Sequence, residues 1–436
     1  MIRIKPEPEN QFVCPRCLAR TPAKEIIVQS AFTLADCICK NCGFEFYQTL
    51  AAGHTTTDSL FIDKLSRKLY PPDTPKTWLS EALLKTFSRI NHHEVPIQKI
   101  IHENRDHVVI LNTLDFLYGH VLLKLYNAVH HLDHNKNLGL VLILPKSFEW
   151  LVPNGCAEIW LVDLKLSDLA AGNSFVQQFI ATEFRRFRTI YVSKAYSHPD
   201  FTNMDIERFT GIKPFDLAVF NKLAPVITFI LREDRWWLGG PTGYWFYRLC
   251  RKLRVLKWGR RVLSMRQNNL IKRTISIIRK QLPETSFLVA GMGTTGNFYG
   301  YALDKRKDVI DEVVEKDWCK IYARSQIVAG VHGSNMLLPT AHAAGCVEIL
   351  PEDRYGNIIQ DISVRYADRR QLYFYRFADQ YASPKTIARK VISMLSNYRV
   401  FHKNMCANIY QADAKPREHS TMYTTIFAPF ADDANR

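Results

Sequence analysis

Residues 327–351, with the sequence IVAGVHGSNMLLPTAHAAGCVEILP, contain the pattern that decides the fold. A continuous apolar run, IVAGV, leads into the small and polar residues HGSN, and a second run, CVEILP, follows a short apolar segment. Apolar runs without alternation are typical of strands buried on both faces of a parallel sheet. The stretch therefore predicts a strand, a tight turn, a short helix and a second strand, which is one unit of an α/β fold.

The same alternation of apolar runs and helical segments continues on both sides of this stretch. Upstream, strands are predicted at residues 107–112, 138–145, 158–163 and 189–194, with helices at 119–131 and 175–187. A second series predicts strands at residues 227–232, 287–292, 327–332 and 346–351, with helices at 268–281, 311–326 and 387–398. The sequence therefore predicts an α/β protein with two Rossmann-like domains in tandem. We expect a ligand cleft between them, at the carboxyl ends of their strands.

The length of the chain also requires more than one domain. Single hydrophobic cores stop growing at about 250 residues, and this chain has 436. The predicted organisation is a zinc ribbon at residues 1–50, a linker at 51–89, Rossmann-like domains at 90–205 and 206–400, and a tail at 401–436. The linker is assigned because Pro and Thr are frequent in AAGHTTTD and YPPDTPKTW. The polar end of the tail is expected to be poorly ordered.

Composition excludes wholesale disorder, since 47% of the residues are hydrophobic and 23% are charged. The opening MIRIKPEPENQF lacks the basic, apolar and small-residue layout of a signal peptide. Apolar runs in the sequence are shorter than the ~20 residues that a membrane span requires. We therefore expect a cytoplasmic protein, in a compartment where clustered cysteines bind metal rather than form disulfides.

Four of those cysteines form two C-x-x-C pairs, Cys14 with Cys17 and Cys39 with Cys42. Two such knuckles present four thiolates in the geometry that a structural Zn²⁺ ion closes, which leaves no open position for catalysis. Cys37 stands one step outside the second pair, and it either substitutes for a ligand or remains a free thiol. The predicted role of the module is docking or domain stabilisation rather than DNA binding.

The net charge is +16, and most of the excess is local. Residues 235–283 contain no Asp or Glu, whereas twelve Lys and Arg residues accumulate from position 248 to position 280. Apolar residues are interleaved with them at helical spacing: Trp245, Phe246, Leu249, Leu253 and Leu256. The segment is consistent with a helix that lies on an anionic membrane, or with a packed helix that has a solvated basic face. Nucleic acid is the least favoured partner.

The turn after the strand at residues 327–332 has the composition of a phosphate-binding site. Small residues let backbone amides approach a ligand, and the following helix amino terminus favours an anion. The candidate residues of this turn are Gly330, His332, Gly333, Ser334 and Asn335. Glu348, on the next strand, is placed to bind ribose hydroxyls. The alternative is an ordinary strand, turn and helix with a buried histidine.

Residues 330–351 resemble the nucleotide-binding half of glycosyltransferases with the GT-B architecture. Their G-x-H-G-x-x turn, small-residue helix and strand containing V-E are most similar to the family of plant xylan xylosyltransferases and extracellular-domain O-linked N-acetylglucosaminyltransferases. ITFILREDR at 227–235 is more loosely similar. The resemblance implies metal-independent transfer of a sugar from a UDP- or GDP-sugar to a glycan or lipid-linked acceptor. Residues 90–205 would then bind the acceptor and residues 206–400 the donor.

The resemblance also implies roles for individual residues. Arg232 and Arg235 would clamp the donor diphosphate and stabilise the leaving group, together with His332. The alternative is that these arginines pair with Glu233 and Asp234 on the surface. The acceptor hydroxyl needs a base, and the candidates are Asp115 and His120, in the loop and helix start after the strand at 107–112.

A competing motif, GMGTTG at residues 291–296, matches the dinucleotide fingerprint and would imply an oxidoreductase that binds NAD or FAD. The fingerprint needs a helix at its third glycine, but NFYGYALDKRKD follows without an apolar stripe. A glycine-rich loop that lines the donor cleft explains the motif more simply. A second alternative is a non-catalytic scaffold that binds nucleic acid or protein through the zinc ribbon and the basic segment.

Overall fold

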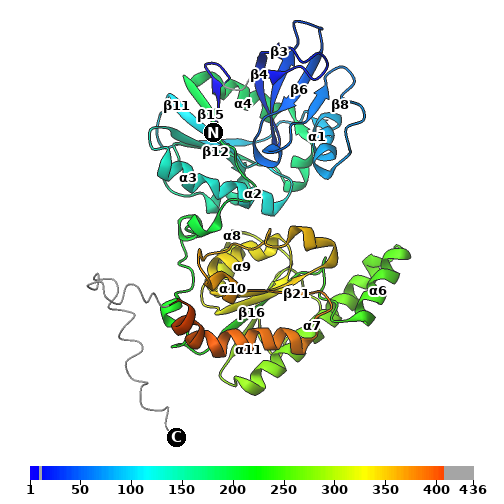
Figure 1. Cartoon of the computed structure of the whole chain (residues 1–436), viewed down its shortest axis with the longest axis vertical. Helices are drawn as coiled ribbons and strands as arrows, with labels where there is room; N and C mark the ends of the chain where they lie inside the picture. The colour runs from blue at the N-terminus through cyan, green and yellow to red at the C-terminus, as the bar shows by residue number, and fades with distance from the viewer. Residues whose placement is uncertain (9–11, 407–436) are drawn as a thin grey trace, which may run out of the picture.

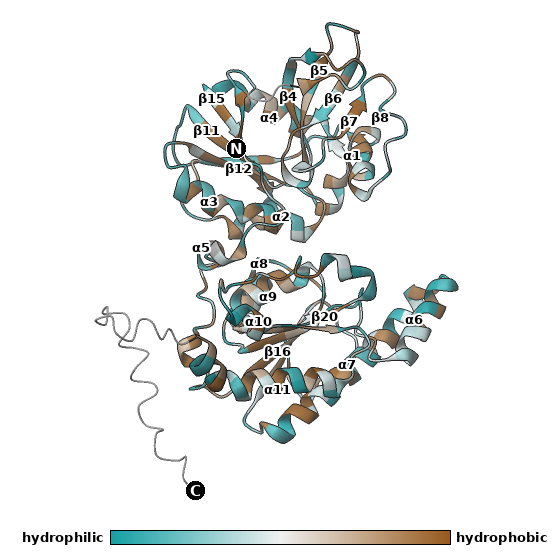
Figure 2. Cartoon of the chain, viewed as in Figure 1, coloured by the Kyte–Doolittle hydropathy of each residue, from teal (hydrophilic) through white to brown (hydrophobic). Residues whose placement is uncertain are grey.

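The computed structural model describes residues 1–8 and 12–406, and the end of the predicted tail lies outside them. Two α/β units lie one above the other along the long axis, and we call them the N-terminal and C-terminal units (Figure 1). Apolar strands run through the middle of both units, and helices cover them (Figure 2). The predicted α/β class with parallel sheets is confirmed. The described helices include none that is both long and apolar enough to cross a membrane.

The N-terminal unit is built on a six-stranded sheet with a parallel centre. The parallel strands, in spatial order, are β15 (Thr189–Val192), β11 (His107–Asn112), β12 (Gly139–Pro145) and β13 (Glu158–Val162). The antiparallel edge strands are β1 (Ile2–Lys5) and β10 (Ile97–Ile101). The covering helices are α2 (Tyr118–Leu125) and α3 (Asn127–His134) on one face and α4 (Ser174–Arg186) on the other. Val108 and Val109 point to opposite faces and are both buried, which explains the uninterrupted apolar runs.

The C-terminal unit contains a second six-stranded sheet, in which every strand is parallel to its neighbours. The strands, in spatial order, are β18 (Leu303–Asp304), β17 (Ser286–Gly291), β16 (Val226–Leu231), β19 (Ile327–Val331), β20 (Gly345–Leu350) and β21 (Tyr375–Asp379). In order of sequence this is 3-2-1-4-5-6, the doubly wound arrangement, and the order reverses between β16 and β19.

Helices cover both faces of this second sheet (Figure 1). On one face α7 (Leu256–Gln281) packs against α11 (Pro384–Phe401). On the other face lie α8 (Glu312–Tyr322) and α9 (Leu337–His342), whereas α10 (Arg370–Phe374), just before β21, contacts α11 through Tyr373. Residues of α9 share a hydrophobic cluster with Val121 and Leu125 of α2, so the two units are packed together directly. A short helix, α5 (Glu207–Thr210), lies in the connection between the units.

The stretch predicted as a linker, residues 51–89, contains regular structure. Its strands β7 (Phe61–Asp63) and β8 (Lys68–Tyr70) extend an antiparallel sheet formed by β4 (Ala23–Gln29), β5 (Phe32–Ile38) and β6 (Glu45–Thr49). Helix α1 (Trp78–Ser88) follows, and a two-strand pairing of β9 (Ile90–Asn91) with β14 (Gly172–Asn173) comes next. The Thr residues at 55–57 lie between β6 and β7, and the Pro and Thr residues at 71–77 lie between β8 and α1. The linker prediction was therefore wrong, because turn residues were counted and the three-residue strands between them were missed.

The five-stranded sheet is continuous with the N-terminal unit rather than separate from it. Ala35 and Phe46 belong to the same buried cluster as Val176 and Ile180 of α4. On its other face, Leu34 packs with residues of α1 in a smaller cluster. The predicted module at residues 1–50 is also not separate at its amino-terminal end, since β1 belongs to the main six-stranded sheet. The cysteine-bearing segment is thus a structural part of the N-terminal unit.

Candidate functional site

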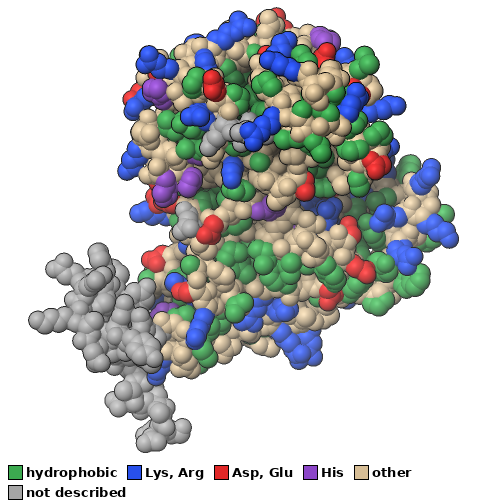
Figure 3. Space-filling model, turned by 45° about the horizontal axis from the view of Figure 1, so that its top comes forward, with side chains coloured by type: hydrophobic (Ala, Val, Ile, Leu, Met, Phe, Trp, Pro, Cys, Tyr) green, Lys and Arg blue, Asp and Glu red, His purple; other side chains and the backbone are tan. Residues whose placement is uncertain are grey.

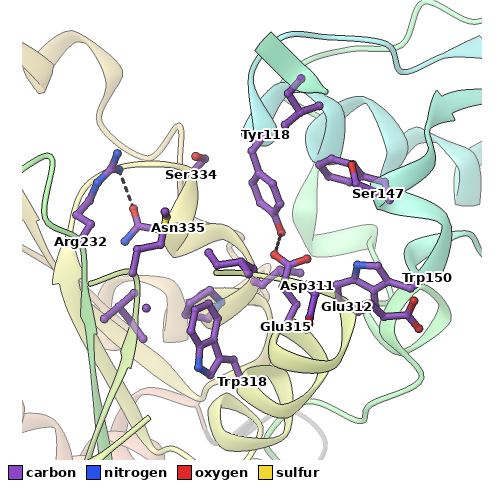
Figure 4. A pocket seen from close by; sticks show the side chains of 18 of the residues that line it. Tyr118, Ser147, Trp150, Arg232, Asp311, Glu312, Glu315, Trp318, Ser334 and Asn335 are labelled. Atoms are coloured by element: carbon purple, nitrogen blue, oxygen red, sulfur yellow. Dashed lines mark hydrogen bonds between the residues drawn. The ribbon is translucent and has the colours of Figure 1, made fainter. Parts of the chain in front are cut away.

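A cavity of about 810 Å³ lies between the two units, at the carboxyl ends of strands from both sheets (Figure 4). The N-terminal unit contributes side chains that follow β12 and β13, and the start of α2. The C-terminal unit contributes residues that follow β16, β17 and β19, and the start of α8. The predicted cleft between the sheets is therefore present. Its lining includes Tyr118, Lys146, Trp150, Arg232, Met292, Glu315, Trp318, Ser334 and Asn335.

One wall of the cavity presents nitrogen donors at the point where the strand order reverses. Arg232 follows the last residue of β16, and its Nη1 donates to Asn335 Oδ1 at 2.9 Å. Its Nε and Nη2 donate to the carboxylate of Asp234 at 2.6 Å and 2.5 Å. Asn335 Nδ2 is buried and has no hydrogen-bond partner among the described residues. This wall therefore holds a guanidinium and an unsatisfied amide donor, the groups that bind phosphate oxygens.

Gly333 allows this wall to form. Its φ of +148° is a conformation that side chains rarely adopt, and a Cβ placed there would lie 1.9 Å from Arg232 Nη1. Any side chain at position 333 would clash with the Arg232 guanidinium, which packs directly against the backbone of the turn. Ser334 and Asn335 then start the short 3-10 helix η6 (Ser334–Met336) on the cavity wall.

The opposite wall combines aromatic rings with a carboxylate. The Tyr118 hydroxyl, on α2, donates to Glu315 Oε1, on α8, at 2.7 Å, so the bond joins the two units (Figure 4). Burial raises the pKa of Glu315. Trp150 and Trp318 line the same space. Aromatic faces pack against the apolar C–H faces of sugars, and carboxylates accept hydrogen bonds from hydroxyls, so this wall fits a polar ring compound.

Sequence reasoning missed this second wall. Glu315 and Trp318 lie three residues apart in a helix that was predicted, but neither was considered for function. The position of the helix in the sequence could have identified these residues. The helix follows the strands β17 and β18, and the first turn of such a helix faces the cleft at the strands' carboxyl ends.

His332 lies behind the cavity wall rather than on it. Its ring is 2% exposed and sits between two carboxylates, with Nδ1 2.9 Å from Glu348 Oε1 and Nε2 3.2 Å from Asp361 Oδ2. Arg235 Nη1 donates to the backbone carbonyl of His332 at 2.7 Å. Glu348 and Asp361 contact the ring of His332 and Arg235 contacts its backbone, so these three side chains support the turn from the side away from the cavity.

The expectation that Glu348 contacts ribose hydroxyls is not met in this structure. Glu348 is fully buried in β20 and faces His332, and burial raises its pKa. Gly330 also lies inside the fold, where a Cβ would come within 2.7 Å of Met336 Sδ. Of the predicted donor-binding residues, Arg232, Ser334 and Asn335 line the cavity, while the others support the turn.

A second cluster of polar residues surrounds Asp115, which is completely buried. Asp115 Oδ2 lies 2.8 Å from Lys124 Nζ, also fully buried, and 2.9 Å from His54 Nε2. His120 Nδ1 lies 3.4 Å from the other carboxylate oxygen. Burial alone would raise the pKa of Asp115, but the Lys124 ammonium and the two histidines hold it well below its usual range. Burial lowers the pKa of His54 to about 4, so this ring is neutral near pH 7.

The burial of Asp115 corrects one of the two base assignments. A carboxylate without exposed surface, paired with an ammonium, has no route to an acceptor hydroxyl. His120 is 12% exposed along its side chain, and its Nδ1 faces Asp115. An imidazole whose Nδ1 faces a buried carboxylate has the arrangement of an oriented general base. His120 is therefore the stronger candidate, with Asp115 as its positioning residue.

His54, Asp115 and His120 offer three ligand atoms within 4.8 Å of one another, which raises the question of a metal ion. The charge of the carboxylate is already balanced by Lys124, whose ammonium would repel a cation at this distance. We interpret the cluster as a hydrogen-bonded network rather than as a metal centre.

The cluster is next to the cavity and has an exposed aromatic ring beside it. A Cβ on Gly119 would lie 2.6 Å from the Ser334 Cβ, so the start of α2 touches the turn of the C-terminal unit. Trp78, 56% exposed at the start of α1, has its ring centroid 5.9 Å from that of His120 and 5.2 Å from that of His54. His54 and Trp78 come from the segment that was predicted to be a linker.

The GMGTTG loop follows β17, and Gly291 and Met292 line the cavity. The next described element is the short strand β18, so the helix that a dinucleotide fingerprint requires is absent from this part of the structure. The loop is fixed instead by Glu233, whose carboxylate accepts from Thr295 N and Oγ1 at 2.8 Å and 2.9 Å. The simpler explanation, a loop that lines the same cleft, agrees with this geometry.

The four cysteines of the two pairs lie together at one end of the five-stranded sheet. Cys14 and Cys17 belong to the hairpin of β2 (Phe12–Val13) and β3 (Arg20–Thr21), and the other pair to the β5–β6 turn. The Cys14–Cys42 and Cys17–Cys39 Sγ distances are 3.7 Å and 3.5 Å, close to the ~3.8 Å edge of a tetrahedron with 2.3 Å Zn–S bonds. The residues therefore fit a Zn²⁺ ion. Cys37 is buried outside this group.

No family model matches the chain, and no curated protein matches it in sequence. Among solved structures, the chain is similar to a 2.2 Å crystal structure of a Listeria monocytogenes protein described as a UDP-N-acetylglucosamine 2-epimerase. Sequence identity is 10%, the similarity covers 68% of each chain, and the TM-score is 0.29.

Proposed function

We propose that the chain is a glycosyltransferase of the GT-B architecture, which moves a sugar from a UDP- or GDP-sugar to a glycan or lipid-linked acceptor during assembly of a surface polysaccharide or glycoconjugate. One observation carries the proposal. Arg232, Ser334 and Asn335 converge where the strand order of a doubly wound sheet reverses, inside a cavity shared with a second α/β unit. Such sheets bind their ligands at this point. The resemblance of residues 330–351 to glycosyltransferases supports the same function.

The donor is proposed to lie with its diphosphate on the first wall and its sugar toward the second. Arg232 and the amide of Asn335 would donate to phosphate oxygens. Arg232 would give up part of its hydrogen bonding to Asp234 when it binds the phosphate. Charge-assisted bonds of this kind stabilise the negative charge that develops on a leaving diphosphate. Trp150, Trp318 and Glu315 would then contact the sugar ring.

The acceptor is proposed to approach from the side of His120. Nε2 of His120 takes the proton of an acceptor hydroxyl, the acceptor oxygen bonds to C1 of the donor sugar, and the bond from C1 to the diphosphate oxygen breaks. Asp115 would not touch the substrate, and its carboxylate, 3.4 Å from His120 Nδ1, would orient the imidazole ring electrostatically. The exposed indole of Trp78 offers a flat surface on which an acceptor sugar can stack.

Cys14, Cys17, Cys39 and Cys42 are proposed to hold a structural Zn²⁺ ion. Four sulfurs leave no coordination position for substrate, so the metal contributes to folding and not to sugar transfer. The cluster supports the five-stranded sheet, whose β6–β7 connection contains His54 and against which α1, with Trp78 at its start, packs, and in this way the module would shape the acceptor side of the site.

Thermal unfolding with UDP, GDP, CMP and NAD tests the proposal. UDP or GDP should stabilise the protein, and Arg232→Gln should lower that affinity at least tenfold, since a hydrogen bond to a charged group is worth about 1.5–3 kcal/mol. Arg188→Gln is the matched control, because Arg188 is exposed just before β15, away from the cavity. Stabilisation by NAD alone would favour an oxidoreductase. A salt-sensitive oligonucleotide complex with no response to nucleotides would favour a scaffold.

A further inference from the structure

Helix α6 (Pro241–Lys252) and the first half of α7 form a hairpin that projects sideways from the C-terminal unit (Figure 1). The helices are antiparallel: Arg266 bonds to Thr242 near the base, and a Cβ on Gly259 would meet the sulfur of Cys250 nearer the tip. The projecting arm carries both basic and hydrophobic side chains on its surface (Figure 3).

The hairpin exposes large apolar side chains that a soluble helix pair would normally bury. Trp258 is 84% exposed and Trp245 is 65% exposed. The whole set, which we call the apolar ridge, is Trp245, Leu249 and Leu253 on α6 and in the turn, and Trp258, Val262 and Met265 on α7. Each row follows the spacing of three or four residues that keeps side chains on one helix face.

The two rows lie on the same side of the hairpin. The contact line between the helices runs through Cys250 and Gly259. At 100° per residue, both rows are rotated from this line in the same sense. In an antiparallel pair, equal rotations place both rows on one side, so the apolar ridge is a single surface.

Positive charge borders the ridge: at 100° per residue, Lys252 and Arg261 lie about 60° from its two rows, whereas Arg251 and Arg260 lie on the opposite side of the hairpin. Residues 235–283 contain no Asp or Glu. The basic side chains of the hairpin tip are Arg248, Arg251, Lys252, Arg254, Lys257, Arg260 and Arg261. Arg248 lies over the rings of Tyr244 and Trp245, which keeps its charge beside the ridge. Arg260 is 4.0 Å from Glu233, a residue of the neighbouring loop.

We propose that the α6–α7 hairpin binds the surface of an anionic membrane, with the apolar ridge inserted among the headgroups and the basic residues paired with lipid phosphates. Amphipathic helices with Trp and Leu on one face and Lys and Arg beside them bind membranes in this way. The aliphatic part of the ridge selects the occupant: a nucleic acid would satisfy the arginines and could stack on the tryptophans, but would leave Leu249, Leu253 and Val262 in water. This inference concerns binding alone and does not depend on the proposed function.

Flotation with lipid vesicles tests the inference on the full-length protein. One set of vesicles contains phosphatidylcholine alone, and the other contains about one third phosphatidylglycerol. The wild type should bind the anionic vesicles at least tenfold more tightly, and its tryptophan fluorescence should shift to shorter wavelength, a shift that the double variant below should lack. The double variant Trp245→Ser, Trp258→Ser should lose at least tenfold in binding. Since both rings are exposed, its thermal unfolding should match the wild type.

Matched controls separate the ridge from exposed apolar residues in general. Leu65→Ser replaces a highly exposed leucine outside the hairpin and should leave vesicle binding unchanged within twofold. Lys252→Gln with Arg261→Gln, two exposed basic residues at the edge of the ridge, should weaken binding to anionic vesicles only. Equal binding to both vesicle types, or unchanged binding by the tryptophan variant, would overturn the inference. Binding to duplex DNA in place of vesicles would also overturn it.

Discussion

The buried pair of Asp115 and Lys124 gives a prediction that can be worked out from the structure. Both side chains are fully buried and their charged atoms are 2.8 Å apart. Asp115→Asn leaves the ammonium without a counter-ion, and Lys124→Met leaves the carboxylate with only its histidine partners. Removing one member of a buried ion pair costs about 3–5 kcal/mol, because the other charge remains uncompensated. The free energy of unfolding of each single variant, measured by urea denaturation at pH 7, should therefore be lower than that of the wild type by this amount.

The double variant Asp115→Asn, Lys124→Met removes both charges while keeping the side-chain volumes similar. It should cost at least about 2 kcal/mol less than the sum of the single variants, since the two residues are coupled. The pKa of Asp115 is held well below its usual range, so its contribution is present above pH ~3.9 and is lost as pH falls through the folded-state pKa. Single variants that cost under about 1 kcal/mol, or a double variant equal to the sum, would refute the reasoning.

Four further predictions concern the site, the histidines and the cysteine cluster. His120→Gln should lower kcat for sugar transfer about 100-fold or more and leave nucleotide affinity within twofold; equal losses in both would argue against a base. Trp78→Ala should raise the KM for acceptor and not for donor, which steady-state kinetics with each substrate varied would decide. Burial lowers the pKa of His54, His131 and His342 to about 4, so the unfolded state takes up protons first. Unfolding free energy should therefore fall between pH 6.5 and 4, by about 3 kcal/mol for each ring at pH 4, and a flat urea series over that range would be inconsistent with it. Chelation of zinc should lower the Tm while UDP or GDP still binds, because the nucleotide wall belongs to the C-terminal unit; loss of nucleotide binding on chelation would contradict this.

The sheets could be predicted because their signal is local. Strands buried on both faces are apolar at most positions, so runs such as residues 108–111 and 327–331 mark them directly. The five-stranded sheet could not be found in the same way. Its strands β7 and β8 have three residues each and lie between Thr and Pro turns, so their pairing with β6 depends on contacts distant in sequence.

The site was only partly predictable for a related reason. Arg232, Ser334 and Asn335 follow predicted strand ends, and strand ends define the cleft. Glu348 also lies near a strand end, but its side chain points beneath the turn toward His332, which depends on the register of β20 against β19. His54, between β6 and β7, and Trp78, at the start of α1, reach the site through the packing of the five-stranded sheet against α4 and α1, and the sequence near them carries no motif.

Amide hydrogen exchange with and without nucleotide tests the central claim most directly, because it reports both binding and its location. UDP or GDP should slow exchange in three loops of the C-terminal unit: those that follow β16, β17 and β19. The α6–α7 hairpin and the cysteine knuckles should exchange as in the free protein. Absence of protection with every nucleotide, or protection confined to segments outside these loops, would contradict the account.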